Sequence, residues 1–169
     1  MPRGARFNGS ATPPCTASDQ QIQAEGNAAC PPASKIGSGT IQTMMGFPTD
    51  PETADITAFN WGKGTVEIVT APGTGRTLAI DRGDFTGPGE LTNHPPKAPG
   101  GPPDFETAVS SLDLNYEDVV RSGHAAFITT PPSCPADGSW ISHVRYSTAD
   151  GRSYHAFSRT PCRRRRYEG

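Results

Sequence analysis

Large aliphatic side chains are scarce in this chain, whereas glycine and proline are unusually frequent. Its 169 residues include 19 glycines and 18 prolines, but only 25 leucine, isoleucine, valine and phenylalanine residues together. Glycine and proline interrupt helices and occupy turns, so a chain of this kind does not build long amphipathic helices. Its net charge of −2 is too small for self-repulsion to keep it unfolded. We therefore expect a folded all-β domain with many chain reversals.

Short runs rich in threonine, valine, isoleucine and aromatic residues recur between turn residues from position 36 onward. They predict eight strands, at about residues 37–44, 54–61, 65–70, 76–81, 106–116, 123–130, 139–148 and 152–159. This number suits an antiparallel β-sandwich of seven or eight strands. Gly62-Lys63-Gly64 predicts a hairpin between the second and third of them. The proline-rich stretch 87–103 is expected to cross between sheets without pairing, because proline cannot donate to a strand ladder.

One short helix is expected near the N-terminus. Ser18 stands three residues before Gln21, the spacing of a capping box, and Gly26 stands where a C-terminal cap belongs. The helix should therefore cover about residues 18–25. We expect an extended N-terminal segment over 1–17, a single β-sandwich domain over 18–162, and a basic, disordered tail over 163–169.

The chain contains four cysteines, Cys15, Cys30, Cys134 and Cys162. An even number of cysteines in a chain with a small core is typical of exported proteins stabilised by disulfides. Four cysteines allow three connectivities, and spacing alone does not select one. Proximity along the sequence favours Cys15 with Cys30 and Cys134 with Cys162. The sequence shows neither a transmembrane segment nor an export signal. Because the cysteines nevertheless indicate export, we expect a secreted or cell-envelope protein whose signal lies upstream of residue 1.

Asp150-Gly151 is the strongest short hairpin signal in the chain. As a two-residue turn, it would place Val144 opposite Phe157 and Tyr146 opposite His155. The large side chains of both strands would then share one buried face, formed by Trp140, Val144, Tyr146 and Phe157. His143 and His155 would point to opposite faces and would not bind one ion together.

Arginine is concentrated at the end of the chain, where Arg163 to Arg166 form a run. Without these four residues, 11 basic residues are set against 17 acidic ones. No basic face is therefore expected along which a phosphate backbone could bind, and nucleic acid is not an expected partner.

Sequence motifs predict no catalytic residue, metal or cofactor. The serine-hydrolase elbow and the glycine-rich phosphate loops do not occur. The cysteines and histidines lack the close spacing of zinc ligands, and the histidines are His94, His124, His143 and His155. Asp113, Asn115 and Glu117 would share an exposed strand face and could offer oxygen ligands to calcium, but the favoured interpretation is an ordinary hydrophilic face.

Two kinds of site stay open as alternatives. Asp104 with Glu106, or Asp81 with Asp84, could act as acid and nucleophile in a glycosidase, which depends on the distance between the carboxyl groups. Aromatic rings could also form a platform on which sugars stack, and the candidates are Trp61, Trp140, Tyr116, Tyr146 and Tyr154.

Three stretches together resemble a known group. They are Cys30-Pro31-Pro32-Ala33-Ser34-Lys35-Ile36-Gly37, then Thr130-Pro131-Pro132-Ser133-Cys134-Pro135 with Trp140, and finally Pro161-Cys162. This pattern resembles a group of uncharacterised secreted actinobacterial proteins, and the resemblance implies an exported β-rich protein without assigning an activity. We expect an exported, non-catalytic structural or binding module, with the cell envelope or carbohydrate as candidate partners. The alternatives are an extracellular hydrolase and a carbohydrate-binding module.

Overall fold

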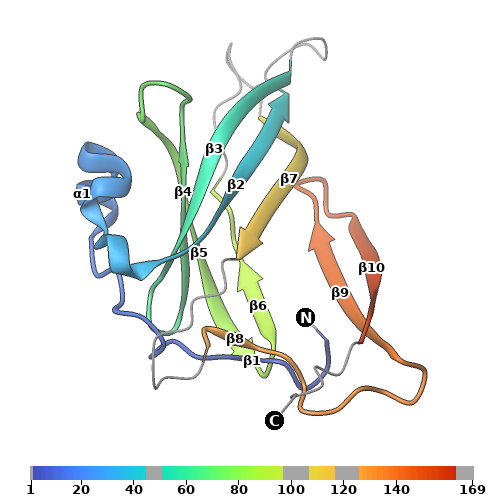
Figure 1. Ribbon diagram of the computed structural model, residues 1–169. Coiled ribbons are helices and arrows are strands. Elements are labelled where there is room, and N and C mark those ends of the chain that lie inside the picture. Colours follow the sequence, from blue (N-terminus) through green and yellow to red (C-terminus); the bar gives the residue numbers. More distant parts are fainter. Residues whose placement is uncertain (1, 45–50, 97–106, 117–125, 163–169) are drawn as a thin grey trace.

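A computed structural model describes residues 2–44, 51–96, 107–116 and 126–162 (Figure 1). Its body is a six-stranded antiparallel sheet curled into a half-barrel. From one edge to the other, the strands are β6 (Glu90–Asn93), β5 (Thr77–Gly87), β4 (Gly64–Thr70), β3 (Pro51–Asn60), β2 (Lys35–Met44) and β7 (Ala108–Tyr116). Strands β2 to β6 are neighbours in sequence order, whereas β7 returns to pair with β2.

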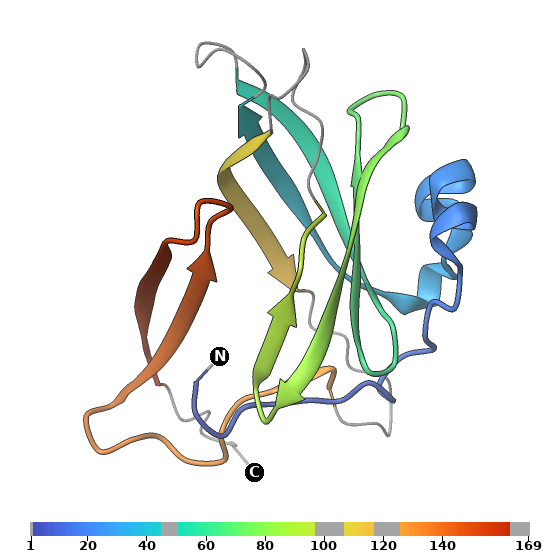
Figure 2. The ribbon, with the colours of Figure 1, turned by 180° about the vertical axis from the view of Figure 1, so that it is seen from behind.

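Two smaller pairs of strands accompany the sheet. Strand β1 (Arg6–Phe7) pairs with β8 (Ile128–Thr129), and together they cross one end of the half-barrel (Figure 1). Strands β9 (Ser139–Ser147) and β10 (Ser153–Pro161) form a hairpin that pairs with neither of the other sheets. Both views place this hairpin on the β7 side of the molecule, with the N-terminus near its base (Figure 2).

The helix α1 (Asp19–Glu25) lies on the outer face of the sheet. Its N-terminus has both halves of the capping box: Ser18 Oγ accepts from the Gln21 N–H at 3.3 Å, and Gln21 Oε1 accepts from the Ser18 N–H at 2.9 Å. Two 3₁₀ turns follow, Gly26–Ala29 and Pro32–Ser34. Arg82 of β5 donates to Asp19 Oδ1 at 2.6 Å and to the Ala17 carbonyl at 3.1 Å, which ties the helix to the sheet.

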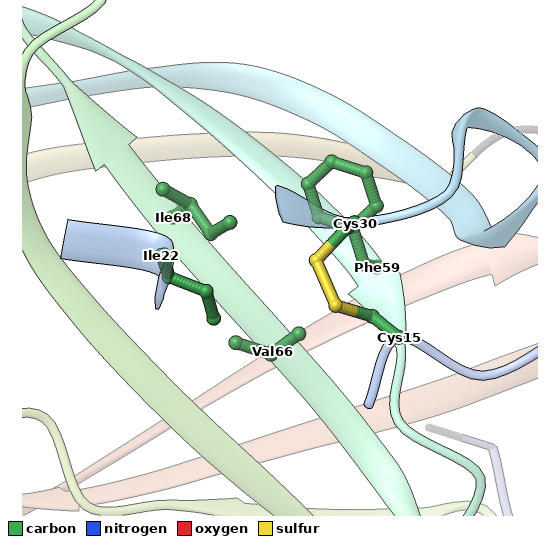
Figure 3. Packing of buried hydrophobic residues seen from close by; sticks show 6 residues of the cluster. All are labelled: Cys15, Ile22, Cys30, Phe59, Val66 and Ile68. Atoms are coloured by element: carbon green, nitrogen blue, oxygen red, sulfur yellow. A yellow bond between two sulfur atoms is a disulfide. The ribbon is translucent and has the colours of Figure 1, made fainter. Parts of the chain in front are cut away.

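A disulfide between Cys15 and Cys30 lies in the buried cluster beneath this helix (Figure 3). The other members of the cluster are Ile22, Phe59, Val66 and Ile68, and all six residues are at most 3% exposed. The second disulfide joins Cys134 to Cys162 at the open end of the hairpin. Both bridges therefore have the connectivity favoured by sequence proximity. Two disulfides indicate that the protein matures in an oxidising environment.

The inner face of the half-barrel has its own buried cluster at the end crossed by β1 and β8. Ala11, Ile36, Ala58 and Phe127 form it. Phe7 stacks on Phe85 with ring centroids 4.5 Å apart, and both rings contact Phe127. Residues 2–17, which we expected to form an extended lead-in, thus contribute to this core. Residues 163–169 lie outside the described part of the chain.

The expected β-rich fold with one helix near the N-terminus is confirmed, but the strands do not form two facing sheets. One curled sheet and a separate hairpin take the place of the predicted sandwich. The hairpin at Gly62-Lys63 is present, with the Trp61 N–H donating to the Gly64 carbonyl. The expectation that residues 87–103 do not pair is wrong for β6, which pairs with β5 after a turn at Pro88-Gly89. Gly89 adopts a φ of +68°, and Glu90–Asn93 contains no proline to interrupt the ladder.

The predicted register of the last hairpin is wrong by one residue. Thr148 donates to the Arg152 carbonyl, which closes a three-residue loop in which Gly151 has a φ of +83°. Val144 consequently faces Ala156, and His143 faces Phe157. Because side chains alternate along a strand, Phe157 lies on the face opposite Val144 and Tyr146, whereas His143 and His155 share a face. No described helix is both long enough and apolar enough to cross a membrane.

We predict unequal roles for the two disulfides. Replacing Cys15 and Cys30 together by serine should lower the free energy of unfolding by about 3 kcal/mol or more, because a short loop is released and a buried cluster is opened. Replacing Cys134 and Cys162 should leave the main unfolding midpoint nearly unchanged, because β10 is exposed along its whole length. Thermal unfolding and limited proteolysis distinguish these effects. In the variant that lacks Cys134 and Cys162, the first proteolytic cut should fall within residues 139–161, whereas the variant that lacks Cys15 and Cys30 should not be cut there first. Equal losses of stability would contradict this prediction.

Candidate functional site

One row of residues crosses the inner face of the half-barrel through five strands. The register aligns Asp81 of β5 with Glu67 of β4, Glu67 with Ala58 of β3, Ala58 with Gly37 of β2, and Gly37 with Tyr116 of β7. Directly paired residues of an antiparallel sheet point to the same face. The row therefore places two carboxylates at one end and a phenol at the other.

The small residues in the middle of this row let its two ends meet. The Tyr116 hydroxyl donates to Glu67 Oε1 at 3.4 Å, across the positions of Gly37 and Ala58. A Cβ atom at Gly37 would lie 2.7 Å from the backbone oxygen of Asn115, so this position does not accept a larger residue without a shift of the backbone. The contact also draws the edge strand β7 towards β4, in keeping with the curl of the sheet.

Asn93 of β6 holds the two carboxylates side by side. Its Nδ2 donates to Asp81 Oδ2 at 2.9 Å and to Glu67 Oε2 at 3.2 Å. Thr65 Oγ1 lies 3.4 Å from Glu67 Oε1 and donates to it. Both oxygens of Glu67 are thus occupied, whereas Asp81 Oδ1 is buried without a hydrogen-bond partner. A buried acceptor of this kind costs stability, because water no longer solvates it.

The environment of Glu67 favours its protonated form. Burial is the largest cause that raises the pKa of this carboxyl, and the negative charge of Asp81 raises it further. Hydrogen bonds from Asn93, Thr65 and Tyr116 act in the opposite direction. Burial, followed by the charge of Glu67, also raises the pKa of the Tyr116 phenol. At neutral pH the phenol is therefore a donor rather than a nucleophile.

The expected carboxylate pairs are arranged differently from the prediction. Asp81 and Asp84 are three residues apart on one strand and point to opposite faces. Asp104 and Glu106 lie outside the described residues, as does Glu117. Glu67, which our sequence interpretation missed, is the actual neighbour of Asp81. A signal was present: Glu67 is the one charged residue within the otherwise uncharged run 64–70.

The other oxygen-rich candidates and the aromatic residues are scattered. Asn115 donates to Asp113 Oδ1 at 2.8 Å, so these two groups satisfy each other. Within the described residues, no group of three or more His, Cys, Asp or Glu side chains is placed to hold a metal ion. Trp61 lies between Lys63 Nζ, at 4.3 Å from its ring centroid, and the Arg82 guanidinium, at 4.5 Å. Tyr116 belongs to the buried row, so the five aromatic candidates do not form one platform.

The β9–β10 hairpin carries the remaining aromatic candidates and exposes both of its faces. The register defines an uncharged face formed by Trp140, Ser142, Val144, Tyr146, Tyr154, Ala156, Ser158 and Thr160, and a cationic face formed by Ile141, His143, Arg145, His155, Phe157 and Arg159. On the uncharged face, the rings of Tyr146 and Tyr154 stack at 5.2 Å. Phe157 of the cationic face is 75% exposed and lies against His143 at 6.5 Å.

Charge is distributed unevenly between this hairpin region and the rest of the chain. Residues 139–162 contain 3 arginines and 1 acidic residue, whereas residues 1–138 contain 8 basic and 15 acidic residues. Within the hairpin, Arg152 pairs with Asp150 at 3.1 Å, and Arg159 lies 3.8 Å from Asp137. We expected no basic face because acidic residues outnumber basic ones over the chain as a whole. That count does not show how charges are distributed, and the cationic face of the hairpin was therefore missed.

No family of known proteins, no curated protein and no solved structure matches this chain. Its function is therefore argued from the two features described above, the buried carboxylate row and the exposed hairpin.

The raised pKa of Glu67 leads to a prediction about stability and pH. A carboxyl whose folded-state pKa lies above its unfolded value favours folding most at low pH, where it is protonated in both states, and loses this advantage as the pH rises through the folded pKa. The Glu67→Gln variant removes the ionisation. Its free energy of unfolding, relative to that of the native protein, should therefore increase as the pH is raised from about 4 to about 8.

Urea unfolding at several pH values, with the disulfides intact, measures this difference. Glu90→Gln is the matched control, because Glu90 is exposed on β6 and the substitution removes the same charge without affecting a buried group. A stability difference for Glu67→Gln that is flat with pH, or equal to that of the control, would contradict the assignment.

Proposed function

We propose that this chain is an exported, non-catalytic binding module and that the β9–β10 hairpin is its binding surface. The two disulfides support export, because such bridges persist in oxidising compartments. The cysteine motifs that resemble those of secreted actinobacterial proteins also support export. The observation that carries the binding role is the exposure of large apolar side chains on both faces of one covalently closed hairpin.

Each face of the ribbon exposes apolar side chains. Val144 and Tyr146 are 58% and 51% exposed on the uncharged face, and Phe157 is 75% exposed on the cationic face. Exposed apolar patches mark interaction surfaces in soluble proteins. The ribbon also carries aromatic residues and arginines, the residue types enriched where partners bind most strongly.

The disulfide makes the ribbon suitable for binding. An isolated two-stranded hairpin is marginally stable in water. Here the Cys134–Cys162 bridge closes its open end, and the Cys162 N–H donates to the Gly138 carbonyl at 2.8 Å. A surface held in its bound conformation loses less conformational entropy when a partner associates.

The hydrolase alternative has less support. Its best carboxylate pair is Glu67 with Asp81, but Glu67 is only 5% exposed and both of its oxygens already accept hydrogen bonds. The pair joins β4, β5, β6 and β7 through Asn93 and Tyr116, which is a structural role. We therefore assign this row to the stability of the half-barrel rather than to catalysis.

A binding panel tests the proposal. The oxidised full chain would be offered immobilised neutral and acidic polysaccharides, single-stranded DNA, anionic lipid vesicles and peptides. We expect binding to at least one class, a decrease of about 10-fold or more in Phe157→Ser, because a protruding aromatic anchor is lost, and no release of reducing sugar ends. The matched control is Leu78→Ser, which removes a 42% exposed apolar side chain from β5. Absence of binding, or equal losses in both variants, would refute the proposed binding surface.

A further inference from the structure

A half-open hollow of about 380 Å³ lies at the base of the hairpin, between β9 and the N-terminal segment. The residues around it that matter here are Pro2, Arg3, Pro135, Trp140, Ile141 and His143. Its volume falls in the range of small-ligand sites, and its lining of proline, isoleucine and aromatic rings suits a flat, partly apolar ligand. Ile141 and His143 belong to the cationic face and Trp140 belongs to the uncharged face, so the hollow adjoins both faces at the base of the hairpin.

The N-terminal side of the hollow is anchored to the fold. Arg6 and Phe7 pair with Thr129 and Ile128, and Ala5 is completely buried. A Cβ atom at Gly4 would lie 3.6 Å from Pro131, so this segment runs close to the chain that leads into the hairpin. Arg3 is consequently held beside the hairpin base while its side chain stays exposed.

Arg3 is the donor of the hollow that the fold leaves unused, because it makes no ion pair among the described residues. Trp140 contributes to the lining, but its indole N–H is buried and not open to a ligand. The carboxylate of Asp137 is engaged, because its Oδ1 accepts from the Ser139 N–H at 3.3 Å and its Oδ2 lies 3.8 Å from Arg159. A ligand that brings oxygen acceptors and a negative charge would pair with the Arg3 guanidinium.

We propose that this hollow and the adjoining cationic face bind an acidic polysaccharide, with one carboxylated sugar ring seated between Arg3, Trp140 and His143. This inference rests on the hairpin being the binding surface. The sugar ring provides a flat face for the aromatic and proline lining, and its carboxylate oxygens accept hydrogen bonds from the guanidinium of Arg3. Arg145 extends the positive charge along the hairpin, where a further acidic unit of the same polysaccharide would lie.

The lining of the hollow favours a polysaccharide over nucleic acid. Proteins that bind single-stranded DNA without sequence preference stack successive bases on a row of aromatic rings. The lining of the hollow includes one indole and one imidazole, those of Trp140 and His143, so it does not offer such a row. A lipid surface is less suitable, because the cationic face carries Phe157 and Ile141 among its charges rather than a continuous apolar stripe.

Calorimetric titration with a galacturonic acid oligosaccharide tests this inference, and a galactose oligosaccharide of the same length is the uncharged comparison. We expect the acidic oligosaccharide to bind at least about 10-fold more tightly than the neutral one, because it brings a charged acceptor to Arg3. Arg3→Gln should lower the affinity for the acidic oligosaccharide by about 10-fold or more. Arg76→Gln removes the same charge from the exposed β4–β5 turn and should change the affinity by less than about 2-fold.

Fluorescence provides a readout that reports position as well as affinity. The chain has two tryptophans, so Trp61→Phe leaves Trp140 as the single indole. Its emission should change on titration with the acidic oligosaccharide. In Trp140→Phe, the affinity should fall several-fold and the emission of Trp61 should stay constant, because Trp61 lies between Lys63 and Arg82 instead.

The outcomes separate this inference from the proposed function. Hairpin-dependent binding of the neutral oligosaccharide, of single-stranded DNA or of phosphatidylglycerol vesicles in preference to the acidic sugar would overturn the inference and leave the binding surface intact. Equal losses in Arg3→Gln and Arg76→Gln would do the same. If no ligand in the panel bound in a way that depends on Phe157, both this inference and the proposed function would be overturned.

Discussion

The Cys15–Cys30 disulfide is the interaction on which both faces of the sheet depend. It lies among Ile22, Phe59, Val66 and Ile68, so it fastens the segment that contains α1 onto the outer face of the half-barrel. The same cysteine sets the path of the N-terminal segment, because the Cys15 N–H donates to the Asn60 carbonyl and the Asn60 amide donates to the Gly9 and Thr12 carbonyls. This path carries Ala11 and Phe7 into the inner cluster. A chain with few large aliphatic residues thus builds two small cores on opposite sides of one sheet, and a covalent bond compensates for their size.

The same scarcity explains why the inner face contains a polar row. Gly37 and Ala58 are too small to fill the space between β7 and β4, and the Tyr116 side chain spans it to reach Glu67. A buried carboxylate is costly unless its lone pairs are satisfied, and Asn93, Thr65 and Tyr116 provide that satisfaction. The raised pKa of Glu67 reflects first its burial and then repulsion by Asp81, and both follow from drawing four strands together at one point.

Features with a local cause were predictable from the sequence. The capping box of Ser18 and Gln21, the turn at Gly62-Lys63 and the pairing of neighbouring cysteines each depend on residues close together in the chain. Features with a distant cause were not. The register of β9 and β10 depended on whether Asp150-Gly151 closes a two-residue or a three-residue loop, and the choice moved Phe157 to the other face. Glu67 and Asp81 meet because β4 and β5 pair in one particular register, and Asn93 joins them from a strand that we had expected to be an unpaired crossover.

The separation of charge between body and hairpin connects this architecture to binding. Residues 139–162 hold 3 arginines and 1 acidic residue, whereas residues 1–138 hold 8 basic and 15 acidic residues, so a negatively charged polymer of the kind we propose would be attracted towards the hairpin and repelled from the sheet. Such steering acts over roughly a Debye length, about 8 Å at physiological salt, so it orients an encounter without holding the complex. The complex that we propose would then be held by contacts at short range, for which Phe157, Trp140 and Arg3 are the candidates. The half-barrel contributes indirectly, because the pairing of β1 with β8 fastens the N-terminal segment that carries Arg3.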